Sequence, residues 1–111
     1  MYVVISSGHG KYIRGASSSP IPPYLDEVDE ARKVVDRVAE YLKSAGVKVD
    51  TFHDNTSHDQ DTNLKTIVNY HNSRPAHDLD VSCHFNANVK TSNPMGAETW
   101  HHSSNGDMFS L

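Results

Sequence analysis

The chain has 111 residues, of which 36% are hydrophobic and 22% charged, a composition typical of one small folded domain. Its formal net charge of -4 gives no general attraction to nucleic acid or to an anionic membrane, and no apolar run approaches the roughly 20 residues of a membrane-spanning helix. A single cysteine, Cys83, excludes a disulfide within the chain and favours synthesis in a reducing compartment.

The first strand is expected over residues 2–6, where Val3, Val4 and Ile5 are β-branched. The preceding methionine is not followed by the basic segment of a signal peptide. We therefore expect a protein that is made in the cytoplasm without a signal peptide.

Two glycines flank His9 directly after this strand, in the sequence Ser-Ser-Gly-His-Gly at residues 6–10. Glycine permits a sharp turn there and holds the imidazole at the carboxyl end of the strand. Residues 11–24 follow as a long loop of the kind that often carries function. His9 is either a plain loop residue or part of a site.

A helix is expected over residues 25–45, because apolar residues recur every three or four positions and Gly46 then provides a stop. On a helical projection Glu27 falls within the apolar face, whereas Glu30 lies about 60° from Glu27, on the side away from that face. A carboxylate in the first turn can stabilise the helix dipole, or it can be a ligand. Glu27 is the acidic residue of this helix that needs a functional explanation.

The later elements continue the alternation of strand and helix, which favours a right-handed parallel βαβ unit and an α/β fold. The expected strand over residues 79–85 runs into a polar turn and carries His84 near its end. The elements expected after Gly46 are a strand over 47–52, a polar loop over 53–61, a helix over 62–73, the strand over 79–85 and a fourth strand over 97–101.

His9, Glu27 and His84 are all predicted to lie at the carboxyl edge of a parallel sheet, where open α/β folds bind ligands. Two imidazoles and one carboxylate form a ligand set that catalytic zinc uses. Zinc at such a site polarises a carbonyl and lowers the pKa of water to about 7, which makes hydrolysis feasible at neutral pH. The alternative is that His9 is a loop residue, Glu27 a dipole carboxylate and His84 a hydrogen-bonded core histidine.

The other reactive side chains fit no catalytic pattern. Cys83 and His84 are neighbours on a strand and point to opposite faces, so Cys83 is expected to be a small core residue. His71 is expected to pack on the apolar face of its helix. Solvation is the default for His53, His58 and His77 in polar loops, and the roles of His101 and His102 stay open.

Four motifs in order resemble the zinc-dependent N-acetylmuramoyl-L-alanine amidases of the amidase-3 type, as found in phage endolysins and autolysins. They are Ser-Gly-His-Gly at 7–10, Leu-Asp-Glu-Val-Asp at 25–29, Val-Ser-Cys-His-Phe-Asn-Ala at 81–87 and Gly-Ala-Glu-Thr-Trp at 96–100. The resemblance implies a three-layer α/β/α domain with a mixed, largely parallel sheet over residues 1–111. It implies that His9, Glu27 and His84 hold one zinc ion, and that Asn86 and Glu98 lie at the edge of the site.

The implied substrate is peptidoglycan, and the implied bond is the amide between the lactyl group of N-acetylmuramic acid and L-alanine. The general-base glutamate of such enzymes is expected beyond Leu111, so we expect a catalytic domain that is incomplete at its C-terminus. The loss of a general acid–base typically lowers a rate 10²–10⁴-fold. The enzyme would act on the bacterial cell wall after its release from the cytoplasm.

Two other functions remain open from the sequence. One is a non-catalytic cell-wall-binding domain on the same fold, in which the histidines are structural. The other is a different zinc hydrolase, such as a carboxypeptidase, because sets of two histidines and one glutamate recur in such enzymes.

Overall fold

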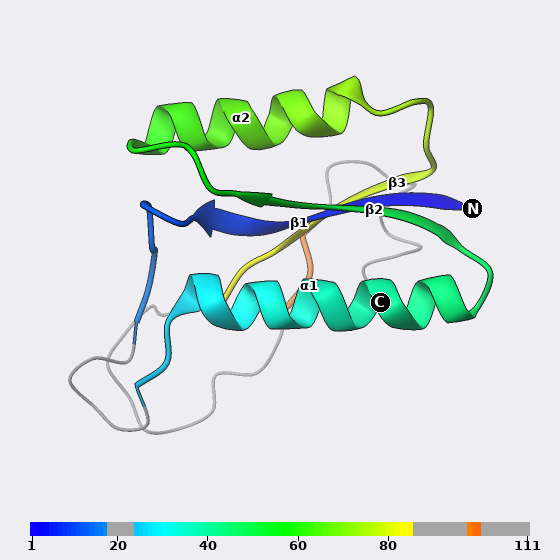
Figure 1. The fold of residues 1–111 in the computed structure, drawn as a ribbon, viewed down its shortest axis with the longest axis horizontal. Coiled ribbons are helices and arrows are strands. Elements are labelled where there is room, and N and C mark those ends of the chain that lie inside the picture. Colours follow the sequence, from blue (N-terminus) through cyan, green and yellow to red (C-terminus); the bar gives the residue numbers. More distant parts are fainter. Residues whose placement is uncertain (18–23, 86–97, 101–111) are drawn as a thin grey trace.

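A computed structural model describes residues 1–17, 24–85 and 98–100 of the chain. In these ranges the elements are β1 (Tyr2–Gly10), α1 (Glu27–Ser44), β2 (Lys48–Asp54), α2 (Gln60–Ser73) and β3 (Leu79–Cys83). The strand order is β2-β1-β3, and both pairings are parallel. Helix α1 covers one face of the sheet and α2 covers the other (Figure 1). The predicted α/β class is confirmed, and the described part has three layers.

Helix α1 forms where its sequence supplies both a cap and an apolar stripe. Asp26 has extended backbone angles, and its side chain accepts hydrogen bonds from the backbone N–H groups of Val28 and Asp29, as an N-cap does. The helix ends before Gly46, which adopts a positive φ of 84°. The buried core cluster joins the helix to the sheet through Ile5, Val35, Ala39 and Val49.

The carboxyl ends of β1 and β3 differ from those predicted. β1 continues to Gly10 rather than ending at Ser6, because Ser7 pairs with Cys83 of β3 and Gly10 pairs with Asp54 of β2. β3 ends at Cys83, so His84 follows the strand instead of lying inside it.

The prediction of a fourth strand is wrong for its described residues. Residues 98–100 adopt no regular secondary structure, and Ala97 and His101 lie outside the described ranges. The Trp100 side chain is 85% exposed, so its strand propensity is not supported by packing against a neighbouring strand. In the described part of the chain, no helix has both the length and the apolar character needed to cross a bilayer.

Candidate metal centre

The side chains of His9, Glu27 and His84 meet at the carboxyl edge of the sheet. They come from the end of β1, the first residue of α1 and the residue after β3. Nε2 of His9 lies 3.0 Å from Oε2 of Glu27, and Nδ1 of His84 lies 3.6 Å from Oε1 of the same carboxylate. One ligand atom from each residue lies within 4.8 Å of the other two. The structure thus brings together the three residues that were predicted as ligands.

Glu27 is held by the backbone on both of its oxygens. Its side chain is 4% exposed, Oε1 accepts a hydrogen bond of 2.9 Å from the Phe85 N–H, and Oε2 accepts one of 3.2 Å from the Ala16 N–H. A buried carboxylate is costly unless such donors compensate for its lost hydration. Because Asp26 already caps the helix, Glu27 is not needed for that purpose, and its carboxylate is fixed between the two imidazoles.

Glycine acts at this site by leaving room for the ligands. The positive φ of the turn, 58°, belongs to His9 itself and not to either flanking glycine. A Cβ at Gly8 would lie 2.1 Å from Cε1 of His84, and a Cβ at Gly15 would lie 2.4 Å from Oε2 of Glu27. Both glycines therefore allow the backbone to approach the cluster more closely than any other residue could.

His84 is not the core histidine that was considered as an alternative. Its side chain is 48% exposed, and its ring meets that of His9 edge to face at 82°, with centroids 5.2 Å apart. Neighbouring Cys83 packs against the core cluster instead, as predicted. Burial, with a smaller contribution from the Glu27 carboxylate, raises the pKa of the Cys83 thiol. The imidazole of His84 thus belongs to the ligand cluster, whereas the thiol of Cys83 belongs to the core.

The donor set has the chemistry and the spacing that zinc requires. Zinc–nitrogen and zinc–oxygen bonds are about 2.0–2.2 Å long, so the donor atoms around a tetrahedral zinc lie about 3.4 Å apart. The separations of 3.0 and 3.6 Å from the Glu27 carboxylate bracket this value. Small side-chain rotations would bring the two imidazole nitrogens to the same distance, since the three atoms already lie within 4.8 Å.

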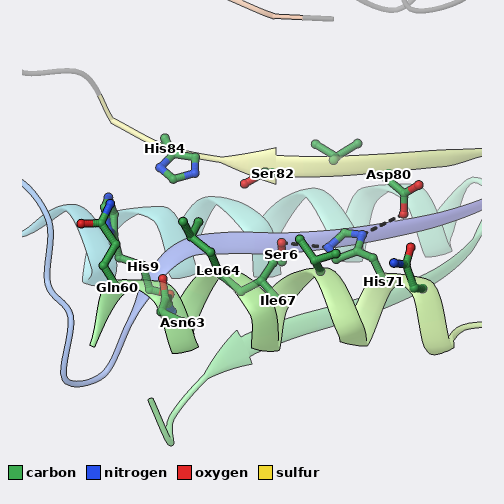
Figure 2. A pocket seen from close by; sticks show the side chains of 13 residues that line it. Ser6, His9, Gln60, Asn63, Leu64, Ile67, His71, Asp80, Ser82 and His84 are labelled. Carbon is green, nitrogen blue, oxygen red and sulfur yellow. Dashed lines mark hydrogen bonds and ion pairs between the residues drawn. The ribbon is translucent and has the colours of Figure 1, made fainter. Parts of the chain in front are cut away.

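A cavity of about 470 Å³ opens beside the two imidazoles (Figure 2). Apolar side chains of α2 and β3 form part of its wall, and the other lining side chains are polar or ionisable; the apolar ones are Leu64, Ile67, Val68 and Val81. Its volume lies within the range of about 300–1,000 Å³ that is typical of small-molecule sites. The candidate metal centre is therefore accessible from a concave surface.

His71 makes specific hydrogen bonds in addition to packing on its helix. Its Nδ1 donates to Asp80 at 2.8 Å, and its Nε2 lies 2.9 Å from the hydroxyl of Ser6 (Figure 2). The order serine, histidine, aspartate resembles a hydrolase triad. Ser6 lies at the wall of the cavity but is fully buried, whereas a nucleophile must be exposed to its substrate. The three residues instead tie β1, α2 and β3 together.

The expectation that His53 is solvated in a loop is wrong, because His53 lies in β2. Its Nε2 donates to Asp36 of α1 at 2.8 Å, and its Nδ1 lies 2.8 Å from the hydroxyl of Ser7. The side chain is consequently 21% exposed. The polar residues next to His53 in the sequence suggested a loop, but they could not indicate that its partners lie on α1 and β1.

His77 and His58 also have partners. His77 donates to the Pro75 carbonyl at 2.7 Å and to Asp80 at 2.6 Å. His58 stacks on Tyr12, with ring centroids 4.2 Å apart. Solvation alone therefore does not describe either residue.

Among the remaining predicted site residues, the structure describes only Glu98. Glu98 is exposed and is not one of the three clustered ligands. Asn86, His101 and His102 fall outside the described residues. Asn63 was not predicted as a site residue, yet it donates a hydrogen bond of 2.9 Å to the His9 carbonyl. The only signal for it was a polar residue in the first turn of α2, which by itself indicates no role.

Comparison with known proteins identifies the family of this chain. No individually curated protein matches the sequence. The family described as N-acetylmuramoyl-L-alanine amidase matches it over residues 3–109. This match includes both histidines and the glutamate of the cluster. The chain therefore belongs to the N-acetylmuramoyl-L-alanine amidase family.

Proposed function

We propose that this chain is the catalytic domain of a zinc-dependent amidase that cleaves peptidoglycan between the lactyl group of N-acetylmuramic acid and L-alanine. The observation that carries the proposal is the buried carboxylate of Glu27, held within 3.0 Å of His9 and 3.6 Å of His84. The family match supports hydrolysis of an amide in peptidoglycan. The proposed role is lysis of a bacterial cell wall, as an endolysin or an autolysin released from the cytoplasm.

In this proposal, His9, Glu27 and His84 hold one zinc ion. Bound zinc supplies a Lewis acid that polarises the scissile carbonyl and lowers the pKa of water. The protein contributes a rigid carboxylate, because two backbone N–H groups fix Glu27 before the metal arrives. The cavity beside the imidazoles gives the substrate access to the same edge of the sheet. Glu98 is exposed in the structure, and no role as the general base is proposed for it.

Metal analysis tests the site. Purified protein is expected to bind about one zinc per chain, and His84→Ala is expected to lose most of it, because one of three protein ligands is gone. His58→Ala is the matched control, since His58 stacks on Tyr12 and belongs to no ligand cluster in the described residues. A full zinc complement in His84→Ala would contradict the proposed ligand set.

Product analysis tests the reaction. Purified cell walls are incubated with the protein, together with any downstream sequence that its natural chain carries. Release of new L-alanine amino termini without new reducing sugar is expected for this amidase. Release of a C-terminal amino acid would indicate a carboxypeptidase instead, and binding to the walls without any product would indicate a wall-binding domain.

A further inference from the structure

Behind His9 lies a pair of buried polar side chains, Asp54 at the end of β2 and Asn63 in α2. Each is 1% exposed. Nδ2 of Asn63 donates to Oδ2 of Asp54 at 2.8 Å and to the His9 carbonyl at 2.9 Å. Both partners can only accept hydrogen bonds, so the amide nitrogen must face them and both of its hydrogens are used. Asn63 thus joins a fixed carboxylate to the backbone of His9.

Asp54 is well suited to orient this amide. Its Oδ1 accepts hydrogen bonds from the Thr56 N–H, the Thr56 hydroxyl and the Ser57 N–H at 3.0, 3.1 and 3.2 Å. Burial alone would raise the pKa of Asp54, but hydrogen bonds from Ser57, Thr56 and Asn63 outweigh it and lower the pKa to about 2. The carboxylate therefore stays ionised at neutral pH and keeps Asn63 in one orientation.

His9 needs such a restraint because its backbone is in an uncommon conformation. A φ of 58° is disfavoured for a residue with a side chain, and surrounding contacts must hold it in place. The Asn63 amide reaches the His9 carbonyl past Gly10, where a Cβ would lie 3.1 Å from Nδ2 of Asn63. Figure 2 shows Asn63 on α2 close to His9, at the end of the cavity where His84 also lies.

We propose that Asn63, oriented by Asp54, is a positioning residue that sets the direction of the His9 imidazole toward the metal. This inference rests on the proposed function, because it concerns a proposed zinc ligand. Asn63 acts through the backbone of His9 and does not touch the metal or the substrate.

The substitution Asn63→Asp tests this role, because it keeps the shape of the side chain and removes the NH₂ group. An ionised carboxylate has no donor, and a protonated one has a single donor for the two acceptors. The zinc affinity, measured by competition with a chromogenic chelator, is expected to fall about 10–100-fold, as it does when a residue supporting a ligand is lost. The visible spectrum of the cobalt-loaded protein is expected to change as well. Asn72→Asp is the matched control, since it makes the same change at an exposed position of the same helix. Wild-type zinc affinity and cobalt spectrum in a folded Asn63→Asp protein would overturn the proposal.

A double substitution separates positioning from stability. Exchanging the two residues, as Asp54→Asn with Asn63→Asp, restores a donor–acceptor pair between these positions but leaves the His9 carbonyl without its donor. We expect the exchange to recover part of the melting temperature of the metal-free protein while the zinc affinity stays low. If zinc affinity recovered together with the melting temperature, the role of Asn63 would be structural only.

A measurement without metal distinguishes this inference from the proposed function. The ¹³Cα and ¹³Cβ chemical shifts of His9 report its positive φ in the metal-free protein, and Asn63→Asp is expected to change them. Unchanged shifts would overturn the inference, whereas failure of the wild-type protein to bind zinc would overturn the proposed function. If Asn63→Asp does not fold, Asn63→Ser serves instead, because one hydroxyl cannot donate to both acceptors.

Discussion

Replacing Gly8 by alanine should disable the metal centre without unfolding the domain. Gly8 lies in β1, and its φ is not positive, so alanine can adopt its backbone conformation. The new methyl group would instead collide with the His84 ring, since the three nearest atoms to it, at 2.1–2.5 Å, all belong to that imidazole. The substitution therefore acts on one proposed ligand.

The expected loss of zinc affinity follows from the distance between the added methyl group and the His84 ring. Carbon atoms pack at about 3.5–4.0 Å, so the His84 ring must move by more than about 1 Å. A metal site tolerates deviations of only about 0.2 Å in its ligand distances. We expect the zinc affinity to fall by more than about 100-fold, or more than about 2.8 kcal/mol, because each tenfold change corresponds to about 1.4 kcal/mol. The side chain of His84 is 48% exposed and can turn into solvent, so the free energy of unfolding should change by less than about 1 kcal/mol.

Chelator competition and urea denaturation of the metal-free protein measure the two quantities, and Gly46→Ala is the matched control. Gly46 has a φ of 84°, and a Cβ added there would meet no atom within 4 Å. Alanine there should cost about 1–2 kcal/mol of stability through backbone strain and leave zinc affinity unchanged. The reasoning would be refuted if Gly8→Ala bound zinc as tightly as the wild type, or if Gly46→Ala lost zinc affinity to the same degree.

Three further predictions concern stability and charge. Glu27→Gln should weaken zinc binding at least tenfold, as measured by chelator competition. It should also lower the free energy of unfolding by about 1–3 kcal/mol in urea denaturation, because the new amide NH₂ must face one of the two backbone N–H donors. Asp26→Ala should cost about 0.5–2 kcal/mol in urea denaturation by removing the N-cap of α1. Hydrogen bonds to the Pro75 carbonyl and to Asp80 raise the pKa of His77 above its ordinary value of 6.5. Protonated His77 therefore stabilises the folded state fully below pH 6.5, and this stabilisation is lost as the pH rises through the folded-state pKa. His77→Asn should remove this part of the pH dependence of the melting temperature, and an unchanged pH profile would contradict the assignment.

The sequence was informative where local chemistry determines structure. The apolar periodicity of α1 predicted that Glu27 lies on the buried face, and in the structure the whole residue is 5% exposed. The order of strand, helix and strand predicted parallel pairing, which places His9 and His84 at one edge of the sheet. These arguments need only the spacing of residues along one element and the direction of parallel strands.

Contacts between distant residues could not be predicted in this way. The bond between Asn63 and the His9 carbonyl joins residues 54 positions apart, and that between His71 and Ser6 joins residues 65 positions apart. The prediction of a fourth strand was wrong for a related reason: strand propensity depends on context, and residues 98–100 adopt no regular secondary structure. The positive φ of His9 was likewise hidden, since the neighbouring glycines suggested that they would adopt it.

The most direct measurement is a crystal structure of the zinc-loaded protein with an anomalous difference map recorded at the zinc absorption edge. We expect one main peak, about 2.0–2.2 Å from a nitrogen of His9, a nitrogen of His84 and a carboxylate oxygen of Glu27. A main peak at any other group of side chains, such as His71 and His77 beside Asp80, would contradict the assignment of the metal centre.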